Sequence, residues 1–133
     1  MMLIDTSVWI EFFNRPQGKT SRHLEELLAK STPVAINAII EMEILQGIRE
    51  DADHEETKAY LEPFQYFPHF SKKYFDLGAE IFRSCRKRGI TVRKSLDCLI
   101  AANCLIDGIA IAHHDRDFRQ ISRIYKDLSV QEL

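Results

Sequence analysis

Short apolar segments alternate with longer helical patterns along this chain, and that alternation constrains its fold most strongly. Apolar runs too short for helices predict strands at residues 2–4, 33–36, 64–67, 109–112 and 128–130. Between them, helical spacing and capping residues predict helices at residues 5–13, 20–30, 37–49, 52–61, 71–89, 95–107 and 118–125. Helices that separate strands in this way favour βαβ units around a parallel sheet. The sequence therefore predicts an α/β fold.

The chain shows no internal boundary. No repeat, low-complexity tract or Gly/Ser linker divides its 133 residues, of which 45% are hydrophobic. A chain of this length buries roughly two thirds of its unfolded surface, enough for one core without disulfides. We therefore expect a single domain over residues 1–133, with the third strand, between Pro63 and Pro68, at an exposed edge of the sheet.

Composition excludes several classes of protein. Cys85, Cys98 and Cys104 form no metal-ligand spacing, so reduced buried thiols are expected rather than a zinc site. No apolar run reaches the roughly 18 residues of a membrane span, and the first residues lack a secretion signal. A cytoplasmic protein without a membrane partner is expected. The net charge of -2 gives no global basic field, so binding to a nucleic acid requires a local basic patch.

Three acidic residues follow predicted strands. Asp5 directly follows the first strand, and Asp115 and Asp117 come after the fourth. In open parallel sheets, the carboxyl ends of the strands form the ligand crevice. Each aspartate has an ordinary alternative as a helix cap. The hydroxyls of Thr6 and Ser7 are also able to cap, however, which would leave Asp5 available for chemistry.

Two further acids lie within predicted helices. Glu43 occurs in an apolar stretch and shares a face with Ile39 and Ile40, whereas Glu41 points nearly the opposite way. An exposed glutamate is the ordinary alternative for Glu43. Asp97 begins a helix, where the helix dipole alone favours a carboxylate. Small residues along its face would also leave room for an ion.

Taken together, these acids predict a metal site. Four like charges at one edge of the sheet would repel each other strongly without a cation. Carboxylate oxygens without His or Cys ligands select a hard ion, Mg²⁺ or Mn²⁺. His113 and His114 are adjacent on an extended backbone and point to opposite sides, so they are not expected to share the metal.

A basic stretch precedes Asp97. Arg83 begins it, and five residues that are candidates for contacts with a nucleic-acid backbone follow: Arg86, Lys87, Arg88, Arg93 and Lys94. A solvated helix end is the alternative interpretation of such a charge run.

At this point the sequence resembles PIN-domain ribonucleases, and specifically the VapC-type toxins of bacterial and archaeal toxin–antitoxin pairs. Four segments carry the resemblance in the same order: MLIDTSVW at residues 2–9, EILQG at 43–47, DCLIAA at 97–102 and HDRDF at 114–118. The resemblance implies metal-binding acids at Asp5, Glu43, Asp97 and Asp115. It also implies that Asp117 and the Ser7 hydroxyl support these ligands, with Asp117 also counted among the catalytic acids.

The resemblance implies a PIN-like α/β/α sandwich with a five-stranded parallel sheet. It further implies a Mg²⁺-dependent endoribonuclease that acts as a toxin, forms a homodimer and is neutralised by a small VapB-like antitoxin whose C-terminal segment enters the acidic groove. DNA would be bound only through the antitoxin. Two alternatives stay open: a catalytically silent PIN-like binding module, and a PIN nuclease that is not a toxin.

Overall fold

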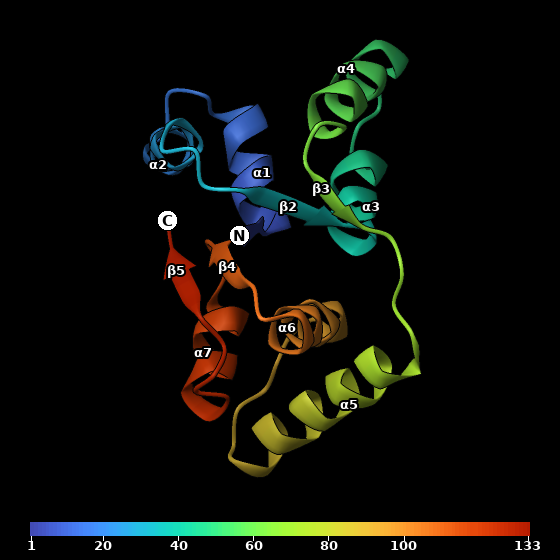
Figure 1. Ribbon diagram of the computed structural model, residues 1–133, viewed down its shortest axis with the longest axis vertical. Coiled ribbons are helices and arrows are strands. Elements are labelled where there is room, and N and C mark those ends of the chain that lie inside the picture. The colour runs from blue at the N-terminus through green and yellow to red at the C-terminus, as the bar shows by residue number, and fades with distance from the viewer.

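The structure, a computed structural model, describes all 133 residues and contains one five-stranded sheet (Figure 1). Its strand order is β3-β2-β1-β4-β5, and all neighbouring strands are parallel. The strands are β1 (Met2–Ile4), β2 (Val34–Asn37), β3 (Gln65–Phe67), β4 (Ala110–His113) and β5 (Val130–Glu132). The predicted α/β class and five-stranded parallel sheet are therefore confirmed.

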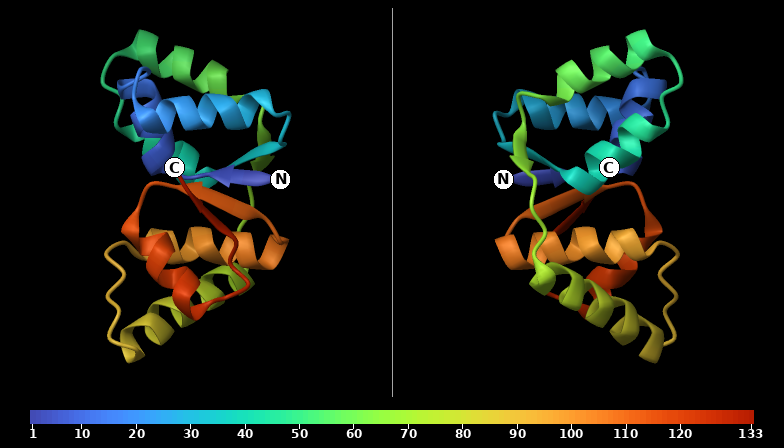
Figure 2. Two further views of the ribbon diagram at one scale, coloured as in Figure 1. Left: turned by 90° about the vertical axis from the view of Figure 1, so that its left-hand side faces the viewer. Right: turned by 90° about the vertical axis from the view of Figure 1, so that its right-hand side faces the viewer.

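Seven helices cover the two faces of the sheet. On one face lie α1 (Thr6–Asn14), α2 (Lys19–Ala29), α3 (Ala38–Gln46) and α4 (Asp51–Leu61). On the other lie α5 (Lys72–Lys87), α6 (Ser95–Asp107) and α7 (Arg116–Ile124). Figure 2 shows the sheet between these layers, viewed from its two edges, which is the predicted α/β/α sandwich.

The central strands and α6 form the middle of the core. Leu3 in β1 pairs with Ile111 in β4, and both side chains are fully buried. Helix α6 is buried continuously from Asp97 to Cys104, because the sheet covers one side of it and α5 the other. At Gly78 in α5, a Cβ atom would lie only 3.5 Å from the backbone of Leu99, so the two helices pack closely. This packing removes Asp97 from solvent.

Most predicted elements are present, with differences at their ends. Strand β3 lies at an edge of the sheet, as the flanking prolines predicted. The final strand was expected at 128–130 but spans Val130–Glu132, because a turn in which the Leu128 N–H donates to the Tyr125 carbonyl delays it. The last helix begins at Arg116, two residues earlier than expected, because Asp115 caps it. The three cysteines are free and buried, and none of the helices is long and apolar enough to span a membrane.

Candidate metal centre

Asp5 lies in the turn between β1 and α1 and is 2% exposed. Its Oδ2 accepts hydrogen bonds from the Ser7 N–H at 3.1 Å and from the Ser7 hydroxyl at 2.6 Å. Asp5 is therefore the N-cap of α1, which is one of the two interpretations that the sequence left open, and neither Thr6 nor Ser7 caps in its place. Oδ1 is buried without any hydrogen-bond partner. Burial raises the pKa of Asp5, and the hydrogen bonds from Ser7 offset part of that rise.

Ser7 connects Asp5 to the neighbouring strand end. Its hydroxyl oxygen accepts a hydrogen bond of 3.0 Å from the His114 N–H, which directly follows β4. Strands β1 and β4 are parallel neighbours, with Ile4 opposite Ala112, so both strands end at the same edge of the sheet. This neighbouring arrangement brings the Asp5 turn and the Asp115 turn together.

Asp115 and Asp117 occupy the turn between β4 and α7. Asp115 caps α7 by accepting a 2.8 Å hydrogen bond from the Asp117 N–H. Asp117 is buried, and its two oxygens accept hydrogen bonds of 3.4 Å from the backbone N–H groups of Arg93 and Lys94. Burial would raise the pKa of Asp115, but the Asp117 N–H and the charges of Lys94 and Arg93 lower it. Asp115 is therefore ionised, and contacts with the Asp117 N–H, Arg93 and Lys94 hold its carboxylate in place.

Asp97 lies in the first turn of α6 and is 1% exposed. Its Oδ2 has no hydrogen-bond partner among the buried polar atoms. Burial, helped by a hydrogen bond with the Asp117 carboxyl group, raises the pKa of Asp97 to about 9. One oxygen from each of Asp97, Asp115 and Asp117 lies within 4.8 Å of the others, and we call these three residues the acidic cluster.

Glu43 lies outside this 4.8 Å group, as does Asp5. Glu43 is half-buried in α3, and the Thr6 hydroxyl donates a 2.9 Å hydrogen bond to its Oε1. Thr6 is the residue that sequence reasoning missed at this site, because it was considered only as a cap. Its position directly after Asp5 was the available signal.

The Lys94 ammonium group is attracted by all four predicted metal ligands. Burial alone would lower the pKa of Lys94, but attraction from the carboxylates outweighs burial and raises it. The attracting residues are Asp97, Asp115, Glu43 and Asp5. Each of these four acids therefore lies near enough to attract the Lys94 ammonium group, although only Asp97 and Asp115 belong to the acidic cluster.

The donor set fits a hard divalent cation. Every candidate donor is a carboxylate oxygen, and two buried oxygens, Oδ1 of Asp5 and Oδ2 of Asp97, have no protein partner. Buried polar oxygens are rarely left without a hydrogen-bond partner, and a cation satisfies such oxygens directly.

The two histidines are not part of this donor set. His113 is buried, accepts a hydrogen bond from the Asp115 N–H and packs on Phe118, whereas His114 is exposed. Burial lowers the pKa of His113.

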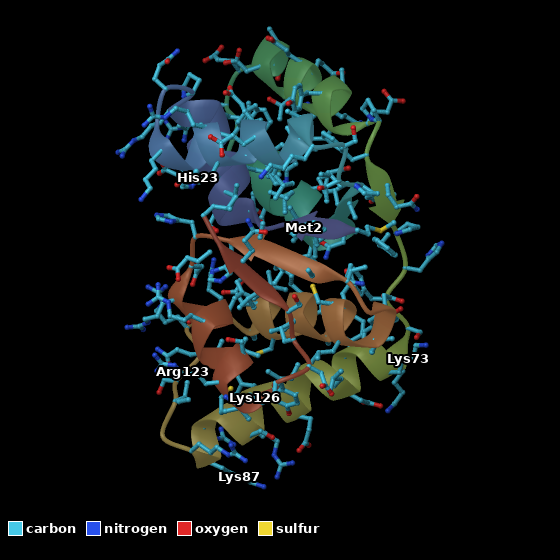
Figure 3. The ribbon with its side chains drawn as sticks, turned by 60° about the vertical axis from the view of Figure 1, so that its left-hand side comes forward. Met2, His23, Lys73, Lys87, Arg123 and Lys126 are labelled. Atoms are coloured by element: carbon cyan, nitrogen blue, oxygen red, sulfur yellow. The ribbon has the colours of Figure 1, made fainter.

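The predicted basic stretch divides into two groups. Arg93 and Lys94 reach the acids: an Nη of Arg93 lies 3.2 Å from Oδ1 of Asp115. Arg86, Lys87 and Arg88 lie at the C-terminal end of α5 and form no ion pair with the acidic cluster. Figure 3 shows Lys87 at this end of α5 and Lys73 at the other.

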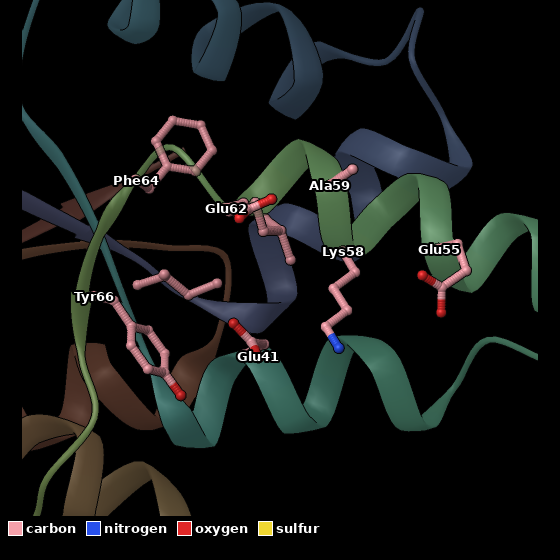
Figure 4. Close-up of a pocket in the computed structure, with 9 residues that line it drawn as sticks. Glu41, Glu55, Lys58, Ala59, Glu62, Phe64 and Tyr66 are labelled. Carbon is pink, nitrogen blue, oxygen red and sulfur yellow. The ribbon is translucent and has the colours of Figure 1, made fainter.

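Two hollows flank α3 on different sides. A groove of about 750 Å³ between α1, α3 and α4 includes Glu43, an apolar wall of Ile10, Phe13, Ile44 and Ile48, and acids at its rim. The smaller hollow in Figure 4, about 370 Å³, is lined by Glu41, Lys58 and Tyr66 and contains none of the predicted metal ligands. Glu41 and Glu43 thus face different sides, as their helical spacing predicted.

Comparisons with known proteins agree with this geometry. The sequence matches the PIN domain family over residues 2–124. It is 35% identical to a VapC ribonuclease of Mycobacterium bovis and to ribonuclease VapC11 of Mycobacterium tuberculosis, over 93% of this chain and 93% of each relative.

Solved structures share the fold. The VapBC2 complex of Rickettsia felis, bound to a promoter DNA fragment, contains a chain with a TM-score of 0.77 and 18% identity, covering 99% of this chain and 98% of its own. A DNA-bound VapBC complex of Salmonella typhimurium gives a TM-score of 0.75 at 17% identity, covering 98% of this chain and 96% of its own. The sheet order, the carboxylates at its edge and the 35% identity over nearly the whole chain together show that this protein belongs to the PIN-domain family, among the VapC ribonucleases.

Proposed function

We propose that this protein is a Mg²⁺-dependent endoribonuclease, the toxin of a VapBC-type pair, that hydrolyses RNA phosphodiester bonds in the cytoplasm. The observation that carries the proposal is the acidic cluster with its unpartnered buried oxygens, in a chain 35% identical to proteins named as ribonucleases. A catalytically silent binding module would not require buried carboxylates to converge, because unpaired buried charge costs about 3–5 kcal/mol.

The four acids Asp5, Glu43, Asp97 and Asp115 would hold Mg²⁺ or Mn²⁺ in this mechanism. The bound ion would supply a water of lowered pKa and offset the charge that develops on the phosphate. Ser7 orients Asp5 and Thr6 orients Glu43 through their hydroxyl hydrogen bonds. Asp117 fixes the backbone of Arg93 and Lys94. Oriented ligands bind a metal better, because their side chains need not be ordered on binding.

The basic residues would hold the RNA. Arg93 and Lys94 are beside the acids, and Arg86, Lys87 and Arg88 extend the positive surface toward the end of α5. Contacts of Lys and Arg with phosphates position a nucleic acid without reading its bases. They would also compensate for the repulsion between the RNA backbone and the acids.

The partner that we propose is a small VapB-like antitoxin, with DNA bound only through it. One structural neighbour is a toxin–antitoxin complex from Klebsiella pneumoniae, and three others, two VapBC complexes and FitAB, are bound to DNA. The groove between α1, α3 and α4 combines an apolar wall with acidic residues, Glu43 among them, which suits a segment with apolar and basic side chains. We also propose a homodimer, which light scattering of the purified toxin would test.

The substitution Asp5→Asn tests the enzyme assignment, because the amide keeps the shape of the carboxylate and loses the charge that binds a hard cation. Purified wild-type protein should cleave RNA with Mg²⁺ and not with EDTA, whereas the variant should be inactive and folded. Expression of the wild type alone should arrest growth, and the variant should relieve the arrest. RNA cleavage by the Asn variant at the wild-type rate would refute the assignment. Cleavage by the wild type without growth arrest would favour a PIN nuclease that is not a toxin.

A further inference from the structure

Lys94 immediately precedes α6, and its side chain reaches over the acidic cluster. Its Nζ lies 3.9 Å from Oδ1 of Asp97 and 3.8 Å from Oδ2 of Asp115. These two carboxylates come from different helices, α6 and the cap of α7. The ammonium group therefore lies between two of the proposed metal ligands.

The backbone holds Lys94 in this position. The N–H groups of Arg93 and Lys94 both donate to Asp117, one to each carboxylate oxygen, at 3.4 Å. The Arg93 guanidinium group lies toward the edge of the cluster, with one Nη 3.2 Å from Oδ1 of Asp115 and Nε 3.7 Å from Oδ1 of Asp117. Only the Lys94 side chain bridges Asp97 and Asp115.

Electrostatics explains why a cation is needed at this point. Asp97, Asp115 and Asp117 offer oxygens within 4.8 Å of one another, so each negative charge placed there makes the next one more costly, and a proton on Asp97 or a nearby cation lowers that cost. The Lys94 side chain is 50% exposed, so its ammonium remains hydrated and is able to move away. A lysine is suited to this role, because its charge is compact and its four-carbon stem is flexible.

We propose that Lys94 is a built-in counter-cation of the acidic cluster, which occupies the cluster in the metal-free protein and competes there with the divalent ion. This inference rests on the proposed metal-dependent function and deepens it. Once an ion neutralises the carboxylates, the ammonium loses its attraction to them and becomes available to an RNA phosphate. Lys94 is then a positioning residue that couples metal binding to RNA binding.

The experiment measures Mg²⁺ and Mn²⁺ binding by calorimetry on the RNA-free protein after treatment with EDTA. Lys94→Gln removes the competing charge and should tighten metal binding by about two- to five-fold, the range expected from partly exposed ion pairs. Lys94→Arg keeps the charge and should remain near the wild type. Lys126→Gln removes the same charge beyond the C-terminal end of α7 and should change nothing.

A second readout is the melting temperature without metal. Lys94→Gln should melt lower than the wild type in EDTA, because the carboxylates lose their counter-charge, and should gain more from added Mn²⁺. Lys94→Arg should restore the wild-type melting temperature in EDTA. This arm remains informative if the affinity change is small.

The outcomes separate this inference from the proposed function. Equal or weaker metal binding by Lys94→Gln, with clear binding by the wild type, would overturn the role of Lys94 and leave the metal site intact. No metal binding by either protein would overturn the metal site and the inference together. Tighter binding by the Gln variant, with the two control variants unchanged, would establish the competition.

Discussion

The Ser7 hydroxyl donates a 2.6 Å hydrogen bond to Oδ2 of Asp5, and so orients a carboxylate whose other oxygen has no protein partner. The same hydroxyl oxygen accepts from the His114 N–H at 3.0 Å. One small side chain thus connects the ends of two neighbouring strands at the point where the candidate metal site is built.

Substitution of Ser7 by Ala should therefore weaken both the fold and the site. We expect a loss of about 1–2 kcal/mol in the free energy of unfolding, because a buried carboxylate and a backbone N–H each lose a partner. Metal affinity should fall as well, because Asp5 loses its orientation. Urea denaturation with and without Mg²⁺ measures both effects. Ser122→Ala is the control, since the exposed Ser122 hydroxyl bonds only to the Arg119 carbonyl of its own helix. Equal stability of the two variants would contradict the expectation.

Thr6 should matter more for activity than for stability. Thr6→Val keeps the side-chain shape and removes the 2.9 Å hydrogen bond to Glu43. We expect a stability change of about 1 kcal/mol and a larger relative loss of RNA cleavage, because Glu43 is no longer held toward the acidic cluster. Cleavage assays over a Mg²⁺ series measure this effect, and Thr6→Ser should rescue it. Full activity of the Val variant at limiting Mg²⁺ would show that Thr6 does not orient Glu43.

The metal-free protein should lose stability as pH rises. Burial raises the pKa of Asp97 from 3.8 to about 9, so between these values the folded state keeps a proton that the unfolded chain releases. The stabilisation is complete below about pH 4 and is lost as pH approaches 9. Melting temperatures in EDTA at about pH 5, 7 and 8.5 measure this slope within that window. Asp97→Asn should flatten the slope, though not fully, because the pKa of Asp5 is also raised. An identical slope in the Asn variant would assign it to another group.

The end of α5 should contribute to RNA affinity through charge alone. Replacing Arg86 and Lys87 by Ala should reduce the slope of log affinity against log salt by about 0.7 per lost phosphate contact, with metal affinity unchanged. The matched control is Lys72→Ala with Lys73→Ala, which removes two charges from the opposite end of the same helix. Filter binding over a salt series tests both variants. Equal slopes for the wild type and the Arg86 and Lys87 variant would exclude this end of α5 from the RNA surface.

The three thiols should be inert in the folded protein. Burial raises the pKa of Cys98 to about 12 and raises the pKa values of Cys85 and Cys104 as well. Because the thiolate is the reactive form, a disulfide reagent at about pH 8 should react with no thiol until denaturant is added, and then with all three. Rapid reaction of one equivalent in native protein would reveal an accessible cysteine.

Much of the fold could be predicted from local sequence. The periodicity and the capping residues predicted the alternation of helices and strands, and Pro63 and Pro68 placed β3 at an edge. Errors occurred where a short-range turn shifted an element, as before β5. At the site, the acids after β1 and β4 were identifiable because strand ends are visible in sequence. The support of Glu43 by Thr6 was not, because it joins residues 37 positions apart.

The basic stretch shows which features the sequence determines by itself and which only the tertiary structure decides. Sequence alone determined that Arg93 and Lys94 precede the helix of Asp97 and that acids follow the central strands, because these are relations between neighbours along the chain. The tertiary structure decided that β1 lies beside β4, that α6 is covered by α5 and the sheet, and that Lys94 bridges Asp97 and Asp115 while Lys87 does not. These contacts depend on how helices pack across the sheet, and no local spacing encodes the direction in which a side chain meets a partner from another helix.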